Sequence, residues 1–183
     1  MSDIAICNRA LRYLGGAEIV SFQQNTREAD LCARHYAEAR DELLESHNWN
    51  FATRYCLLPQ LAEAPPFGFA RAYRLPEDCL RVRRLADGSN YEVVEKRTLY
   101  TDASPARAIV TARVTDPTGY PSLFVEALAR RLAMALAVPL MNSARLEQAL
   151  AQRYGAALEL ARVADASEGV ADPEEANPWL QAR

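Results

Sequence analysis

The stretch that decides the fold is READLCARHYAEARDELLESHNWNFATRYCLL, residues 27–58. Its first two thirds repeat apolar and small side chains every three or four positions, which is typical of one buried face of an α-helix. These residues are Ala29, Cys32, Tyr36, Ala39 and Leu43, and the opposite face is charged. The pattern predicts a helix that opens at Asn25, is capped by Asn25 together with Glu28, and runs to about Ser46.

The two histidines of the chain belong to this stretch. His47 precedes the helix-ending run Asn48-Trp49-Asn50-Phe51, and a protonated imidazole is favoured near a helix C-terminus, which gives it a structural role. His35 lies among charged residues beside the inward stripe, so we expect it in solvent or at the edge of the core. Neither position predicts catalysis.

Three further helices are expected outside this stretch. Their ranges are Ser2 or Asp3 to about Leu14, closed by Gly15-Gly16; Ser122 to Val138, after Pro121; and Asn142 or Ser143 to about Ala164. The helix over 122–138 is apolar nearly all round, which indicates burial on most sides. A small four-helix domain does not cover such a helix alone, so the pattern also predicts contacts between subunits.

The middle of the chain changes character. Four prolines fall between Pro59 and Pro76, and short alternating runs follow at 80–83, 91–93, 99–100 and 109–114. Asp87-Gly88 is a turn signal between two of these runs. The pattern predicts a small antiparallel sheet that is too short to be stable alone and rests on the helices or on a neighbouring subunit.

Together these patterns predict a mainly α fold: a four-helix bundle with an inserted small antiparallel β region and a flexible C-terminal tail. The expected segments are 1–58 and 118–164 for the two halves of the bundle, 59–117 for the β region and 165–183 for the tail. The tail is acidic by composition. Its Pro178-Trp179-Leu180 either docks on another protein or folds back on the core of its own chain, since an exposed tryptophan usually serves as an anchor.

Composition excludes several classes of protein. The chain has 183 residues, half of them hydrophobic, and a net charge of −3, which argues against a dedicated DNA-binding domain. Its four cysteines form no CxxC pair and have no adjacent histidine, so we expect no metal site and a reducing cytoplasm. No secretion signal is visible, and charged residues and a proline interrupt the apolar stretch 123–141, so no membrane span is expected.

No motif for chemistry stands out. The sequence has no phosphate-binding glycine loop, no GxSxG and no HExxH. Carboxylate pairs such as Asp41 with Glu45, or Glu77 with Asp78, are expected by chance among twenty-four acids. We therefore expect no enzyme and no cofactor, with a tail-associated cell-wall or polysaccharide hydrolase that uses Glu77 or Asp78 as the alternative. A helix-turn-helix at Gly15-Gly16 is disfavoured because its second helix is acidic and repels phosphates.

Several strings agree in order and spacing with one family. They are residues 27–58 quoted above, PPFGFARAYRLPEDCLRV at 65–82, YEVVEKRTLYTD at 91–102, Thr115-Asp116-Pro117, and LFVEALARRLA at 123–133. In these strings the chain resembles the tubular tail protein A family of podovirus-like phages, which are head-to-tail adaptors or gatekeepers. The resemblance covers nearly the whole chain and is weakest in the final twenty residues.

The resemblance implies a virion protein, assembled in the host cytoplasm, that forms a dodecameric ring between the portal and the tail nozzle and lines the DNA channel. Its partners would be further copies of itself, the portal protein, the nozzle protein and, transiently, DNA, with no membrane. It implies no cofactor and no catalytic or metal-binding residue.

The motif residues then have structural roles. Trp49 and Phe51 would anchor the chain reversal after the second helix. Tyr73, Leu75 and Pro76 would fix the start of the first strand, and Arg74 would be available for an ion pair. Tyr91 belongs to the family's sequence pattern as well. In the tail, Pro178, Trp179 and Leu180 would dock on the portal or a neighbour, with ordering from about Ser167 onward.

Overall fold

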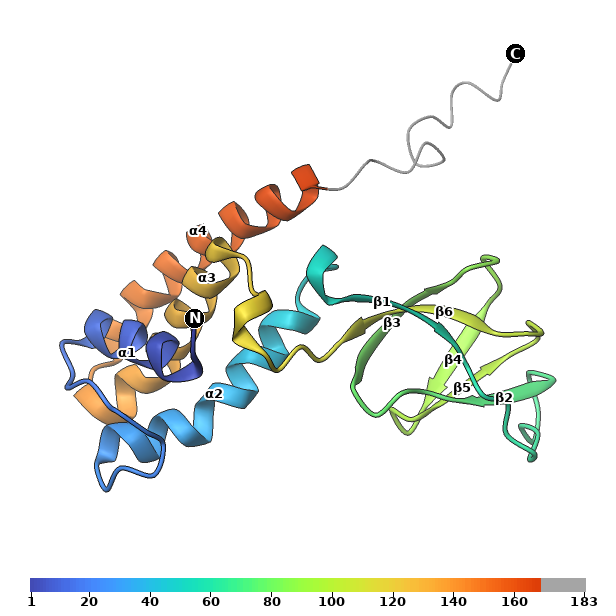
Figure 1. The fold of residues 1–183 in the computed structure, drawn as a ribbon, viewed down its shortest axis with the longest axis horizontal. Coiled ribbons are helices and arrows are strands. Elements are labelled where there is room, and N and C mark those ends of the chain that lie inside the picture. Colours follow the sequence, from blue (N-terminus) through green and yellow to red (C-terminus); the bar gives the residue numbers. More distant parts are fainter. Residues whose placement is uncertain (169–183) are drawn as a thin grey trace, which may run out of the picture.

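Helices gather at one end of the molecule and strands at the other in the computed structural model, which describes residues 1–168 (Figure 1). The helices are α1 (Asp3–Leu14), α2 (Arg27–Glu45), α3 (Ser122–Met141) and α4 (Ala144–Glu168), with short 3-10 turns η1 (Asn50–Ala52) and η2 (Pro117–Gly119). The strands are β1 (Thr53–Leu57), β2 (Arg71–Arg74), β3 (Cys79–Leu85), β4 (Tyr91–Val94), β5 (Thr98–Thr101) and β6 (Arg107–Ala112).

The first two helices begin and end at residues that satisfy their terminal backbone groups. The hydroxyl of Ser2 accepts a hydrogen bond from the Ala5 N–H, and Gly15 closes α1 with a φ of 71°, a conformation that suits glycine. The cap of α2 lies one residue later than predicted, because Thr26 rather than Asn25 accepts a hydrogen bond from the Ala29 N–H, and the helix begins at Arg27. The predicted inward stripe of α2 is confirmed, since all five of its residues are buried.

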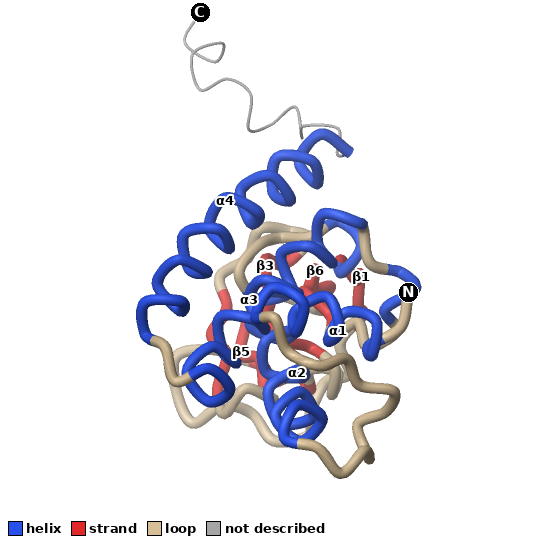
Figure 2. Tube along the Cα trace, turned by 90° about the vertical axis from the view of Figure 1, so that its left-hand side faces the viewer, coloured by secondary structure: helices blue, strands red, loops and turns tan. Residues whose placement is uncertain are grey.

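The helix α3 is the centre of the helical part. It packs against α1, α2 and α4, as Figure 2 shows, and nine of its twenty residues are buried. Its residues Leu123, Val138 and Met141 remain exposed, so the expectation that α3 also takes part in contacts between subunits stays a prediction. The helix continues past Pro139 and ends at Asn142, which adopts a left-handed conformation with a φ of 50°.

The helix α4 starts where the hydroxyl of Ser143 accepts a hydrogen bond from the Leu146 N–H. It continues to Glu168, four residues beyond the predicted end near Ala164. The first residue assigned to the tail, Asp165, is thus helical, and it is also buried.

The strands form two three-stranded antiparallel sheets, ordered β1-β6-β3 and β2-β5-β4. A single bridge between Gln60 and Tyr73, with backbone bonds from Leu61 N to Ala72 O and from Arg74 N to Pro59 O, ties the end of β1 to the second sheet. The turn at Asp87-Gly88 is present, with Gly88 at a φ of 72°. Neither β1 nor β2 was among the predicted runs.

The predicted fold class, a mainly α four-helix bundle, is wrong. Among the described residues the structure is a mixed α/β fold with 49% helix, 3-10 turns included, and 18% strand, and the sheets enclose a second hydrophobic core. This core contains Leu58, Tyr73, Leu75, Val82, Leu85, Leu99, Ala103, Ala106, Ala108 and Val110. Short strands reach stability here because the two sheets bury one face of each against the other. Leu80 of β3 also packs against the helical core.

Polar contacts join the helical part to the sheets. The guanidinium of Arg113, after β6, donates to Asp41 of α2 at 2.7 Å, and Arg83 of β3 donates to the carbonyls of Asn48 and Trp49 and to the Thr53 hydroxyl. Arg83 therefore binds both the turn after α2 and the first residue of β1, and fixes where the β part begins.

Candidate interaction surfaces

The motif residues Trp49 and Phe51 lie in an aromatic cluster at the turn after α2. Trp49 is 1% exposed, donates its indole N–H to the Leu43 carbonyl at 2.8 Å, and meets Phe124 of α3 edge-on at 5.1 Å between ring centroids. Phe51 contacts Phe124 at 4.8 Å and Tyr120 at 5.9 Å. Burial raises the pKa of Tyr120 to about 12. The cluster attaches the turn to α3.

Asp165 fastens the end of α4 to the same turn. Its carboxylate accepts a hydrogen bond from the Asn50 N–H at 2.9 Å and lies 3.2 Å from Nε2 of His47. The side-chain amide of Asn50 donates to the Asp165 carbonyl at 2.6 Å. Sequence reasoning missed this role because Asp165 was assigned to the acidic tail. The usable signal was that the helical spacing Leu150, Tyr154, Ala157, Leu158, Ala161 continues to residue 165.

The remaining motif residues lie in the β part. Tyr73 is buried and donates its hydroxyl to the Ala103 carbonyl at 2.7 Å, while the hydroxyl of Tyr91 contacts the carbonyls of Val82 and Arg83. Pro76 lines a cleft of about 560 Å³ between β3, the β4–β5 hairpin and the end of α2. Arg74 is exposed and forms no ion pair with the residues that the structure describes. Pro178, Trp179 and Leu180 lie outside the described residues.

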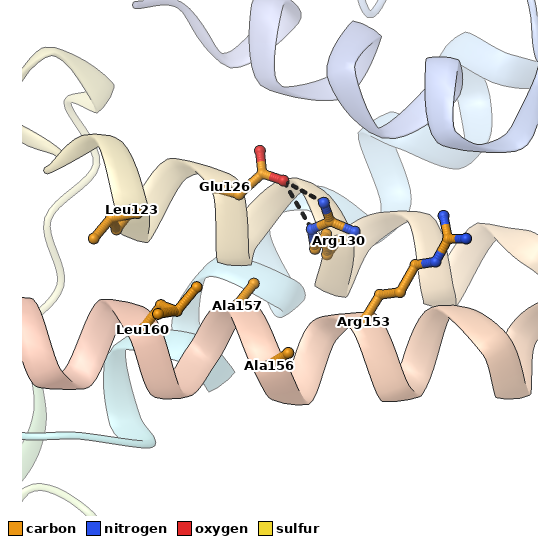
Figure 3. A pocket seen from close by; sticks show the side chains of 7 residues that line it. All are labelled: Leu123, Glu126, Arg130, Arg153, Ala156, Ala157 and Leu160. Carbon is orange, nitrogen blue, oxygen red and sulfur yellow. Dashed lines mark hydrogen bonds and ion pairs between the residues drawn. The ribbon is translucent and has the colours of Figure 1, made fainter.

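An apolar groove of about 440 Å³ runs between α3 and α4 (Figure 3). Leu123 and Leu160 lie at one end of it, on α3 and α4 respectively, Ala156 and Ala157 line its middle, and Arg130 and Arg153 lie toward the other end. Leu123 is 40% exposed and Leu160 is 63% exposed. Exposed leucines beside a helix–helix groove are typical of a protein contact surface.

A charged network borders this groove. Glu126 accepts hydrogen bonds from the Tyr13 hydroxyl at 2.7 Å and from Arg130 at 2.7 Å, and it pairs with Arg9 at 3.3 Å. Burial alone would raise the pKa of Glu126, but the bonds from Tyr13 and Arg130 and the nearby positive charges lower it below its ordinary value. The network links α1 to α3. Of the two arginines that line the groove, Arg130 belongs to this network, whereas Arg153 forms no ion pair among the described residues.

A second exposed apolar surface lies on the sheet β1-β6-β3. Tyr55 is 78% exposed and Leu57 is 69% exposed, and with Ile109, Pro105 and Arg107 they line a shallow groove of about 300 Å³. Both residues belong to β1, one of the two edge strands of this sheet.

The two parts of the molecule carry opposite charge. Residues 53–114 have ten basic and seven acidic side chains, a net charge of +3, whereas residues 1–52 and 115–168 have ten basic and fourteen acidic ones, a net charge of −4. The overall charge of −3, to which residues 169–183 contribute −2, therefore conceals a basic β end and an acidic helical end.

Residues suited to chemistry are dispersed. Within residues 1–168 no group of three His, Cys, Asp or Glu is placed to hold a metal ion, and no helix has the length and hydropathy needed to cross a membrane. Asp78 pairs with Arg54 at 2.5 Å and Glu77 is exposed. A hydrogen bond to Cys32 and burial raise the pKa of the Cys7 thiol, and burial raises that of Cys79 to about 11, so these thiols stay protonated at neutral pH.

Comparison with known proteins assigns no family. No protein-family model matches the chain, and no curated protein matches it. The surfaces described above are therefore interpreted from their own geometry and charge.

Proposed function

We propose that the chain is the subunit of a phage head-to-tail connector, an adaptor that forms a ring between the portal and the tail nozzle and lines the DNA channel. The observation that carries the proposal is the segregation of charge, +3 on the β part and −4 on the helical part. Oppositely charged ends attract one another between identical copies, and such head-to-tail contacts close into a ring when the rotation between copies allows it.

The α3–α4 groove supplies the apolar component of this contact. Leu160 and Val163 of α4 are more than half exposed, although they lie on a helix whose inner side is buried against α3. Charge directs the encounter of two copies, while burial of such side chains supplies most of the free energy of association. Arg153 at the end of the groove suits an acidic side chain of the neighbouring copy.

The ordered sequence strings that resemble the tubular tail protein A family supply the portal, the nozzle and the dodecameric ring in this proposal. Passing DNA would meet the chain only transiently if the basic β part lies against a neighbouring copy and the acidic helical part faces the channel, because a surface of net negative charge does not retain phosphates.

Light scattering after size-exclusion chromatography, with the chain alone and mixed with a portal ring, tests the proposal. We expect a complex with the portal that contains a ring of subunits, and we expect Leu160→Asp to weaken ring formation because it places a charge in the apolar groove. A chain that stays monomeric and never joins the portal would overturn the proposal. A chain that is monomeric alone but assembles on the portal supports it, since the portal then serves as template.

A further inference from the structure

The last turn of α4 and the first residue of β1 lie close together. Asp165 is held by two hydrogen bonds to Asn50, and Asn50 is three residues before Thr53, where β1 begins. The described part of α4 ends at Glu168, three residues after Asp165. Whatever follows Glu168 in the chain therefore starts beside the root of β1.

β1 has one side without a strand partner. The backbone N–H of Leu58 donates to the Ala106 carbonyl at 2.9 Å. Because every second residue of a strand in an antiparallel pair bonds to the same neighbour, the backbone groups of Cys56 and Leu58 are directed toward β6. Tyr55 and Leu57 then direct their backbone N–H and C=O groups outward, and no other described segment bonds to them. Such an edge accepts a further strand.

The face beside this edge changes from basic to apolar along β1. Arg83 lies at the root, held to the hydroxyls of Thr53 and Thr111 at 2.7 and 2.8 Å. The apolar groove of Tyr55, Leu57 and Ile109 comes next.

The sequence after Glu168, GVADPEEANPWLQAR, has the matching order. Its acids, Asp172, Glu174 and Glu175, come first. Trp179 lies four residues after Glu175, which is the same spacing that separates Leu57 from Thr53 at the two ends of β1. Eleven extended residues from 169 to 179 reach up to about 36 Å, whereas the five residues of β1 span about 17 Å. The segment is therefore long enough to place its acids at Arg83 and its tryptophan at Leu57.

We propose that residues 172–180 of the same chain lie alongside β1, in the same direction, on the outer face of the β1-β6-β3 sheet. The acids face Arg83, Trp179 covers the groove of Tyr55 and Leu57, and backbone groups of residues 176–180, apart from the Pro178 nitrogen, bond to the open edge. The proposal concerns the single chain and does not rest on the adaptor function.

Two observations favour this occupant and this place. A tether of a few residues gives an effective concentration in the millimolar range, which favours the chain's own segment over that of a second copy. The α3–α4 groove offers apolar side chains and the unpaired Arg153 as well, but its helical backbone is already bonded and cannot accept a strand.

Hydrogen exchange of backbone amides tests the proposal on the free chain, compared with a chain that ends at Glu168. We expect the amides of Tyr55 and Leu57 to exchange about tenfold more slowly in the full chain, and Trp179→Ala to remove this protection. Amides of α3 should be unchanged and report an intact fold.

A matched pair of variants localises the contact. Leu57 and Leu160 are similarly exposed, at 69% and 63%, so Leu57→Ser should remove the protection of the Tyr55 amide and Leu160→Ser should leave it. Equal exchange in the full and shortened chains would overturn the proposal. Protection of the Tyr55 and Leu57 amides that rises with protein concentration would overturn the proposal that the segment belongs to the same chain, and would indicate that the segment of a second copy binds there. Neither outcome bears on assembly with the portal.

Discussion

At the scale of single residues, Asp165 shows how one buried carboxylate fixes a helix to a distant turn. It is 6% exposed, and its partners His47 and Asn50 lie more than a hundred residues earlier in the chain. Removal of a buried acceptor of this kind lowers the stability of the folded state, because the remaining N–H donors are then buried with neither a protein acceptor nor water to bond to.

We predict that Asp165→Ala lowers the free energy of unfolding by about 2 kcal/mol, since it leaves the Asn50 N–H without its acceptor. Urea denaturation followed by circular dichroism measures the change. Glu168→Ala, an exposed acid on the same helix, is the matched control and should change stability little. Equal stability of the two variants would show that the Asp165 contacts do not hold the helix end.

The Glu126 network predicts a dependence of stability on pH. The folded state holds the pKa of Glu126 below its ordinary value of 4.5, so the folded state releases this proton more readily than the unfolded state. The resulting stabilisation is fully present above pH 4.5 and is lost as the pH falls through the lower pKa of the folded state. The midpoint of urea denaturation, measured between about pH 3 and pH 6 to cover the ordinary pKa of a glutamate, tests this dependence. We expect this midpoint to fall less steeply with decreasing pH in Glu126→Gln than in the natural chain. Identical pH profiles would contradict this assignment.

At the scale of elements, the helices were more predictable than the strands. The ends of α1 and the buried stripe of α2 follow from caps and from a 3.6-residue period, which are local signals. β1 was not predicted because Tyr55 and Leu57 are exposed apolar residues, so the strand lacks the alternation of polar and apolar side chains that marks a half-buried strand. The second sheet core was not predicted because it depends on β2 and β5 meeting β3 and β6, which is a long-range pairing that no short window of sequence contains.

Of the candidate surfaces, the sequence indicated the aromatic turn at Trp49 and Phe51 but not the surfaces exposed for contact. The apolar pattern of α3 led to the prediction of subunit contacts; α1, α2 and α4 cover most of this helix, and the contacts between subunits stay a prediction. The exposed leucines are on its rim and on α4, at Leu123 and Leu160, where the sequence pattern resembles that of any amphipathic helix.

The two cores predict two separable folding units. Leu99 is fully buried in the sheet core and Leu132 in the helical core, so each leucine tests one unit. We expect Leu99→Ala to cost about 2–5 kcal/mol in the sheets and to speed amide exchange in β2, β4 and β5 while leaving α3 protected. Leu132→Ala should act chiefly on the helices. Equal acceleration everywhere in both variants would mean that the parts unfold as one unit.

At the scale of the whole molecule, the charge segregation predicts opposite effects for one chemical change made at two places. Arg74 of β2 and Arg145 of α4 are both exposed arginines without an ion pair among the described residues. Arg74→Glu reduces the charge of the β part from +3 to +1, whereas Arg145→Glu changes that of the helical part from −4 to −6. If oppositely charged ends meet in the ring, the first variant should weaken association between copies and the second should strengthen it.

Sedimentation over a series of protein concentrations measures this association, at about 0.05 M and about 0.5 M salt, because screening shortens the reach of surface charges to a few ångströms at the higher value. The difference between the two arginine variants should shrink at high salt, while Leu160→Asp should weaken association at both values, since its effect is mainly on apolar burial. Weakening of equal size in Arg74→Glu and Arg145→Glu would exclude an end-to-end contact directed by charge. The ring would then have to be held by the apolar groove of α3 and α4 alone.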